Sequence, residues 1–175
     1  MCAHSEGIDT YSIGFGSHSE GNKTSAIGVE SHSEGLNTIA YGEYSHAEGA
    51  NTYASSKYSH AEGFETSAIG SITHTIGWRT LAVGQASFAE GSYTSAYGEY
   101  SHTEGTYTTT NAKYAHAEGV SSVASGYRSH AEGVATYALG DGTHTEGFNV
   151  SADGQGAHAA GFNTHAKGAG SYAAG

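Results

Sequence analysis

Residues 17–30 read SHSEGNKTSAIGVE, which is one copy of a 14-residue unit that repeats along the whole chain. Each unit contains two related heptads, and in this copy residues 17–21 open the first and residues 24–28 open the second. About 12 units fill the 175 residues without an insertion, which is the signature of a repeat architecture. The glycine that follows the first heptad's Glu position marks the spacing, at Gly7, Gly21, Gly35, Gly49, Gly63, Gly77, Gly91, Gly105, Gly119, Gly133, Gly147, Gly161 and Gly175.

The period of the unit predicts β-structure and argues against a coiled coil. A coiled coil needs apolar residues at two positions of each heptad, whereas the recurring positions here hold Ser, Thr, Ala and Gly. Glycine twice per unit would also destabilise a helix. Alternation of small and larger side chains over five residues is typical of a short strand, so we expect two five-residue strands and two two-residue turns per unit. The chain is therefore predicted to be an all-β solenoid with 14 residues per coil.

The pleat of a strand sorts the side chains of the unit onto two faces. In the first strand, Ser17, Ser19 and Gly21 are expected to point to one face, and His18 and Glu20 to the other. Only small side chains fit the thin space inside such a coil, so the Ser, Thr, Ala and Gly positions are predicted to face inward. Coils about 4.8 Å apart would form a rod about 60 Å long. Because so thin a coil buries little apolar surface, we expect the chain to associate with other chains.

Composition and charge argue against several kinds of partner. The formal net charge is −11 and only six Lys and Arg are present, whereas nucleic-acid binding needs clustered basic residues. No apolar run approaches the roughly 18 residues of a membrane helix, so no membrane insertion is expected in this segment. Residues 1–2 are interpreted as a leader or cloning remnant before one repeat domain, residues 3–175. Cys2 has no second cysteine with which to form an internal disulfide.

The repeat resembles the head repeats of trimeric autotransporter adhesins of the YadA type, whose heptads follow S-x-A-x-G and whose units often read S-V-A-I-G-x-x-S-x-A-x-G. The resemblance spans residues 3–175 and includes both heptads, both glycines and the turn lengths. It implies a left-handed parallel β-roll and a homotrimer around a common axis. It also implies an extracellular, structural segment of a bacterial surface fibre, a rigid spacer that offers a surface to host cells or matrix.

The S-H-A-E-G form of the unit is also similar to repeats of phage tail fibres and appendages. That similarity implies the alternative of a fibre shaft on a virion or phage-tail-like particle. The chain departs from the adhesin repeats in its first strand, where the family places Val and Ile and this chain places His and Glu. In the family these positions face the trimer axis, so the resemblance implies a polar axis here.

Two rows of polar side chains are therefore the candidate site, and each row holds one residue per unit. The His row consists of His4, His18, His32, His46, His60, His74, His102, His116, His130, His144 and His158. The Glu row consists of Glu6, Glu20, Glu34, Glu48, Glu62, Glu90, Glu104, Glu118, Glu132 and Glu146. Apolar residues interrupt them at Ile76 and Phe88, which are predicted to be neighbours and to form a dry plug. Ala160, Tyr172 and Ala174 interrupt the pattern near the end.

Three interpretations of these rows stay open. In the first, His and Glu pair along the axis of a trimer, since an unpaired buried carboxylate is costly. In the second, the rows are a solvated face. In the third, they bind metal ions, because imidazole suits zinc, nickel and copper; ligands repeated about every 4.8 Å would crowd the cations too closely for full occupancy. No cofactor is predicted, and anions, ordered water or an occasional metal ion on the His row are the bound species considered.

Pairing of His with Glu has a consequence for pH. A paired His should have a raised pKa and a paired Glu a lowered one, so stability should peak between the two. The remaining candidate is Trp78 beside Arg79, a surface-binding feature in a row of turn aromatics that could equally serve packing. No catalytic arrangement is expected, because Ser45 and His46 point to opposite faces of one strand and cannot form a triad with Glu48.

Overall fold

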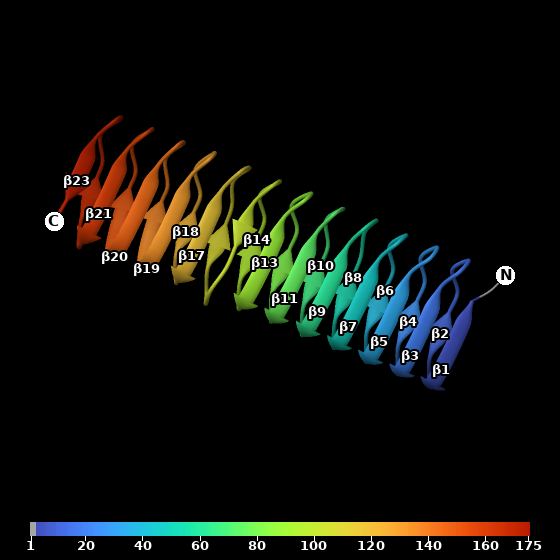
Figure 1. Ribbon diagram of the computed structural model, residues 1–175. Helices are drawn as coiled ribbons and strands as arrows, with labels where there is room; N and C mark the ends of the chain where they lie inside the picture. The colour runs from blue at the N-terminus through green and yellow to red at the C-terminus, as the bar shows by residue number, and fades with distance from the viewer. Residues whose placement is uncertain (1–2) are drawn as a thin grey trace.

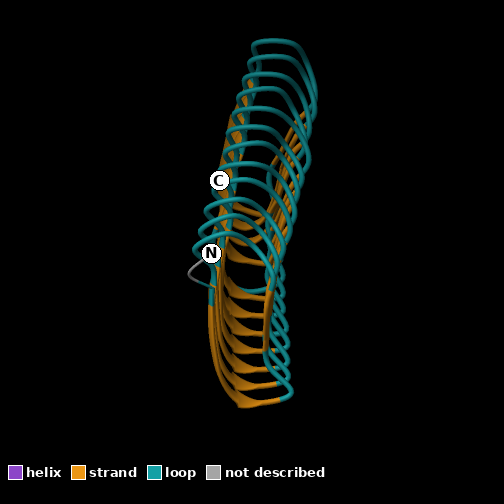
Figure 2. Ribbon diagram, turned by 90° about the vertical axis from the view of Figure 1, so that its right-hand side faces the viewer, coloured by secondary structure: helices purple, strands orange, loops and turns teal. Residues whose placement is uncertain are grey.

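Each 14-residue unit forms one coil, and the coils stack in chain order into an elongated rod (Figure 1). The computed structural model describes residues 3–175, so the interpretation of residues 1–2, Cys2 included, lies outside the described residues. The two ends of the chain lie at opposite ends of the rod. Viewed from the side in Figure 2, strands lie over strands and turns over turns from coil to coil. The β-solenoid with 14 residues per coil and about 12 coils is confirmed.

Two sets of strands make up the coils. The first strand of each coil is β1 (His4–Ile8), β3 (His18–Asn22), β5 (His32–Leu36), β7 (His46–Ala50), β9 (His60–Phe64), β11 (His74–Trp78), β13 (Phe88–Ser92), β15 (His102–Thr103), β17 (His116–Val120), β19 (His130–Ala138), β20 (His144–Ala152), β21 (His158–Phe162) or β23 (Tyr172–Ala174). The second is β2 (Tyr11–Ser12), β4 (Ser25–Ala26), β6 (Ile39–Ala40), β8 (Tyr53–Ala54), β10 (Ser67–Ala68), β12 (Leu81–Ala82), β14 (Ser95–Ala96), β16 (Thr109–Thr110), β18 (Val123–Ala124) or β22 (His165–Ala166). In β19 and β20 the two strands are continuous.

The register between coils is constant. Each strand pairs in parallel with the equivalent strand of the next coil, and residue i lies opposite residue i+14, from His4 opposite His18 to His158 opposite Tyr172. An uninterrupted period in the sequence therefore becomes straight rows of equivalent side chains along the rod. No proline interrupts these ladders, which need every backbone N–H.

The two heptads differ more than their sequences suggest. The prediction of two five-residue strands and two-residue turns is wrong for the second heptad, because its strand has only two residues in most coils and five residues connect it to the next coil. Gly21 also breaks the predicted pleat: its φ of 115° places it outside the strand region, and it is exposed rather than inward-facing. The backbone therefore bends at the glycine after Glu, which ends the alternation that the heptad pattern predicted.

The interior contains only small side chains, as predicted. Alanines such as Ala26, Ala47 and Ala61 are fully buried, and Val150 is the largest fully buried side chain. Buried hydroxyl groups are placed at the turns, where Ser17 donates to the carbonyl oxygen of Gly14 at 2.7 Å. The same bond recurs in later coils at Ser31, Ser45, Ser59, Thr73, Ser87, Ser101, Ser129 and Thr143.

The buried threonine row offers a test of this interior. The hydroxyl of Thr66 is buried without a hydrogen-bond partner, so Thr66→Val is expected to stabilise the chain by about 1 kcal/mol, since an unsatisfied polar group is removed. Thr38 is the matched position with partners: its hydroxyl lies 2.7 Å from Ser33 Oγ and donates to the Glu34 carbonyl oxygen at 3.2 Å. Thr38→Val should therefore destabilise the chain. Denaturant unfolding of both variants checks this, and the same sign at both positions would contradict it.

Candidate functional site

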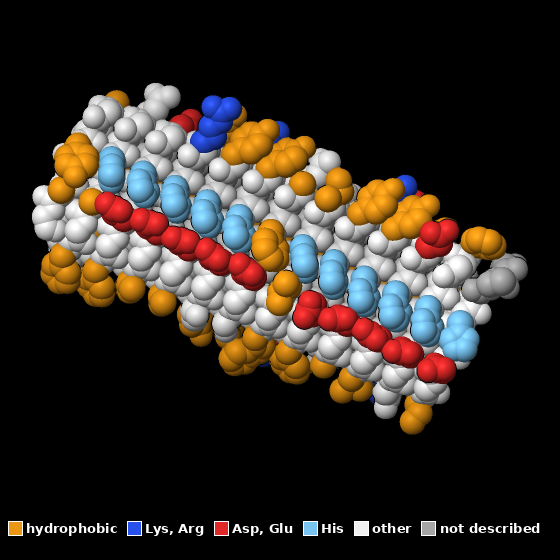
Figure 3. All heavy atoms as spheres, in the orientation of Figure 1, with side chains coloured by type: hydrophobic (Ala, Val, Ile, Leu, Met, Phe, Trp, Pro, Cys, Tyr) orange, Lys and Arg blue, Asp and Glu red, His pale blue; other side chains and the backbone are white. Residues whose placement is uncertain are grey.

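The His and Glu rows lie side by side on one outward face of the rod (Figure 3). The first residue of each first strand supplies His and the third supplies Glu, so both point away from the buried Ser and Ala between them. The side chains are partly shielded by their neighbours: His46 and Glu34 are 32% and 33% exposed. This surface, made of the His row, the Glu row, Ile76 and Phe88, is called the ladder face below. The sequence predicted its members and their common direction.

Constant register turns the His row into a stack of imidazole rings. The ring centroids of His18 and His32 are 4.8 Å apart with planes 2° from parallel, and those of His60 and His74 are 4.5 Å apart. Phe88 continues the stack, with its ring centroid 4.9 Å from that of His102 and 8° from parallel. Aromatic groups in register on neighbouring strands stabilise a sheet, so the row contributes to cohesion between coils.

The Glu carboxylates lie between histidines of two coils. The Nε2 atom of His46 is 3.5 Å from Glu48 Oε2 in its own coil and 3.7 Å from Glu34 Oε1 in the preceding coil. Glu132 shows the reverse relation, with Oε2 3.8 Å from His130 Nε2 and Oε1 3.8 Å from His144 Nε2. These distances exceed that of a normal hydrogen bond. The predicted pairing along one strand is therefore supplemented by a diagonal pairing between coils, Glu(i) with His(i+12).

The interruptions of the ladder face follow this diagonal. Ile76 takes a Glu position and Phe88 the His position 12 residues later, which is the separation of Glu34 and His46. The predicted neighbourhood of Ile76 and Phe88 agrees with the register of β11 and β13 and with the apolar break in both rows in Figure 3. Ala160 and Tyr172 are also 12 residues apart, since they replace another Glu and the His of the following coil. Diagonal partners are thus absent together.

The expected rise in histidine pKa is wrong for the residues that show a shift. Burial, followed by repulsion from the neighbouring imidazoles, lowers the pKa of His46 and of His116, and the pKa values of His74 and His144 are lowered for the same reasons. Stacked rings cannot all carry a proton at 4.8 Å spacing. This contribution to stability is complete above the ordinary histidine pKa and is lost as the pH falls.

The Glu row shows shifts in both directions. A hydrogen bond shared with Glu118, together with burial, raises the pKa of Glu104 to about 7. The same hydrogen bond lowers the pKa of Glu118, in the direction expected from the sequence. Burial and hydrogen bonds with its two Glu neighbours raise the pKa of Glu132 to about 6. A proton shared between adjacent carboxylates thus relieves the repulsion that stacking creates.

A change in pH should therefore act through Glu104. Because its pKa is raised in the folded chain, its stabilising contribution is present at acidic pH and is lost as the pH rises through about 7. Glu104→Gln is expected to gain stability relative to the unmodified chain between pH 4.5 and 8, on the order of 1 kcal/mol after screening by solvent. Unfolding by urea across this range, in the presence of a chelator, measures the gain. Glu30→Gln, at an exposed turn, is the control, and a difference independent of pH would contradict the prediction.

The serine beside each histidine is used structurally. Ser45 is buried, and its hydroxyl donates to the carbonyl oxygen of Gly42 at 2.7 Å, while His46 lies on the outer face. The predicted separation of Ser45 and His46 onto opposite faces is confirmed, so these residues form no nucleophile and base pair.

Trp78 and Arg79 lie on the edge of the rod, at the turn that follows β11. Arg79 donates to Glu65 and, at 2.8 Å, to the hydroxyl of Tyr93, and its guanidinium lies 5.8 Å from the Trp78 ring. Tyr93 and Tyr107 stack at 4.9 Å beside them. The structure confirms that Trp78 is exposed, at 47%; a ligand for this edge stays a prediction.

Comparison with known families identifies the repeat. The model of the YadA head domain repeat matches residues 5–31, 19–45 and 117–143. The chain carries YadA head domain repeats. The matched segments cover less than half of the chain, but the other coils share their period, register and backbone, as shown above. No curated protein matches the chain. Within residues 3–175 there is no helix long and apolar enough to cross a membrane.

The YadA head repeat is a structural feature of adhesins, and in this chain it is built with a polar ladder face. The matches at residues 5–31 and 117–143 each contain ladder residues, including His18, Glu20 and Glu118. The repeat backbone therefore tolerates His and Glu at outward positions of the first strand, because these side chains do not enter the coil interior.

Proposed function

We propose that this chain is a rigid segment of an extracellular trimeric adhesin fibre on a bacterial surface, with the ladder faces of three chains directed to the common axis. The match to YadA head domain repeats carries the proposal. In this role the rod is a spacer, and its outer edges present the surface that meets a host cell or matrix. The left-handed sense of the coil and the trimer are those implied by the family.

The composition of the rod supports association. Its interior consists of Ala, Ser and Thr, so little apolar area is buried within one chain. Many large apolar side chains are instead exposed, and they follow the two turn edges of the rod, such as Ile8, Leu36, Phe64, Tyr100 and Phe148. Apolar surface on this scale marks interaction sites. Packing between chains would cover part of it and leave the rest for adhesion.

Molar mass in solution tests the trimer. Three chains of 17.9 kDa give about 54 kDa by light scattering. Ile76→Asp places a charge in the apolar break of the ladder face and is expected to shift the mass toward the monomer, since an unpaired charge would be buried at the axis. Ile72→Asp is the control: Ile72 is 55% exposed on a turn edge, with a φ of 62° that Asp tolerates. A monomer before substitution, or equal effects of both variants, would refute the arrangement.

A fibre shaft on a phage or phage-tail-like particle is the alternative with the same architecture. The S-H-A-E-G form of the repeat favours it. Antibodies against the rod distinguish the two locations by electron microscopy: the adhesin proposal expects label on intact bacteria, and label on virions alone would replace it with the alternative.

A further inference from the structure

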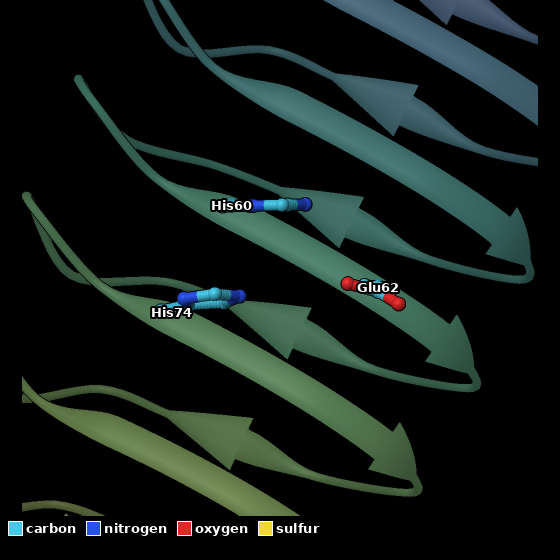
Figure 4. A group of neighbouring side chains, drawn as sticks. All are labelled: His60, Glu62 and His74. Atoms are coloured by element: carbon cyan, nitrogen blue, oxygen red, sulfur yellow. The ribbon is translucent and has the colours of Figure 1, made fainter.

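Buried nitrogen atoms without partners line the ladder face. In ten of the eleven ladder histidines, all but His4, the Nε2 atom is buried and has no hydrogen-bond partner. Each of these nitrogens points toward the Glu row rather than to solvent, as Figure 4 illustrates for His60 and His74 on either side of Glu62. Buried polar atoms normally have a partner, so this recurring deficit calls for a ligand.

The spacing around these nitrogens fits a metal ion better than a hydrogen bond. His46 Nε2 lies 3.5 and 3.7 Å from oxygens of Glu48 and Glu34, and His116 Nε2 lies 3.9 and 3.8 Å from oxygens of Glu118 and Glu104. Hydrogen bonds are shorter, up to about 3.2 Å. Two bonds of 2.0–2.2 Å to a tetrahedral ion place nitrogen and oxygen about 3.4 Å apart. The gap is therefore close to that of two ligands of one ion.

Charge favours a cation in the same place. Ten carboxylates follow one line at the spacing of the coils, and like charges directly opposite each other destabilise a sheet. One divalent ion between two carboxylates balances both. A neutral imidazole supplies a lone pair without adding charge, and a set of nitrogen and carboxylate donors suits zinc, nickel or copper.

We propose that the ladder face binds divalent transition-metal ions of the zinc class, each held by one histidine Nε2 and by the carboxylates of its own and the preceding coil, in alternate coils. Glu34, His46 and Glu48 form one such set, with ligand atoms within 4.8 Å of one another. The set Glu20, His32 and Glu34 shares a carboxylate with it. Neighbouring coils therefore compete for ligands, which is why alternate coils are filled.

The apolar break sets the number of ions. Ile76 and Phe88 divide the Glu row into two blocks of five carboxylates, Glu6 to Glu62 and Glu90 to Glu146. At two carboxylates per ion, each block holds two ions, and the chain holds four. Every ligand comes from one chain, so the proposal does not depend on the trimer, and failure of either leaves the other standing.

Titration with zinc chloride alone tests the proposal. The full chain is freed of metal with a chelator and titrated by calorimetry at pH 7.5, and bound zinc is then counted by elemental analysis after dialysis. Saturation near four ions per chain is the expected result. Glu34→Gln with Glu48→Gln leaves a single adjacent pair in the first block, so the number should fall to three. Glu30→Gln with Glu43→Gln, two exposed turn carboxylates, should leave four.

Two further variants separate the ladder from adventitious binding and from misfolding. His165→Gln removes the histidine outside the ladder face and should leave the number at four. Ile76→Glu with Phe88→His joins the two blocks into eleven carboxylates, and the number should rise to five. Circular dichroism verifies the fold of each variant. The absence of saturable uptake, a number unaffected by the ladder variants, or a loss in His165→Gln would overturn the proposal.

Discussion

Gly35→Ala is expected to destabilise the rod by at least about 3 kcal/mol. Gly35 has a φ of 108°, in a region that side chains rarely adopt, and a Cβ atom there would overlap the carbonyl oxygen of Gly49 in the next coil. The bend and the close stacking of backbones both depend on the missing side chain. Unfolding in guanidinium chloride measures the loss. All thirteen units keep glycine at this position, whereas Ser56 and Ala112 replace the second glycine in two coils.

Gly156→Ala is the matched control. Gly156 has a φ of 64°, and a Cβ atom there would meet nothing within 4 Å. Tyr44 and Tyr58 occupy the equivalent turn position of other coils with φ of 56° and 59°, which shows that this corner accepts side chains. We expect a change within about 0.5 kcal/mol. An equal loss at Gly35 and Gly156 would mean that glycine matters for chain flexibility rather than for stacking distance.

Ala61→Leu is expected to cost about 3 kcal/mol, because the interior has no room for three more carbon atoms. Ala61 is fully buried and lies in register between Ala47 and Thr75 of the adjacent coils, so a larger side chain must separate the two sides of the coil. The strain would extend to the neighbouring coils, since each one rests on the next. Thermal unfolding followed by circular dichroism measures the loss.

Ala50→Leu provides the control for added volume. Ala50 lies in register between Leu36 and Phe64 on an exposed turn edge, so leucine there joins a row of large apolar side chains. Its stability should be unchanged within about 0.5 kcal/mol. If Ala61→Leu were equally harmless, the interior would be wider than the structure shows.

Most of the fold could be predicted because the repeat encodes it in one dimension. An uninterrupted period of 14 residues fixes the coil length, and the parity of a strand then places Ser19 inside and His18 outside. The members of the ladder face followed from the same two facts. The prediction went wrong where backbone conformation departs from a strand: Gly21 turns the chain at a φ of 115°, and the second heptad keeps only two strand residues.

The sequence by itself determined the coil, the small-residue interior and the presence of His and Glu rows on one face, because all three depend on period and parity alone. Only the tertiary structure decided how the rows interact. The diagonal contact from Glu34 to His46 and the proton shared by Glu104 and Glu118 depend on the direction in which side chains lean between stacked coils. That direction is set by the stacking of one coil on the next, so neither the pairing nor the fall in the pKa of His46 could be predicted from spacing along a single strand.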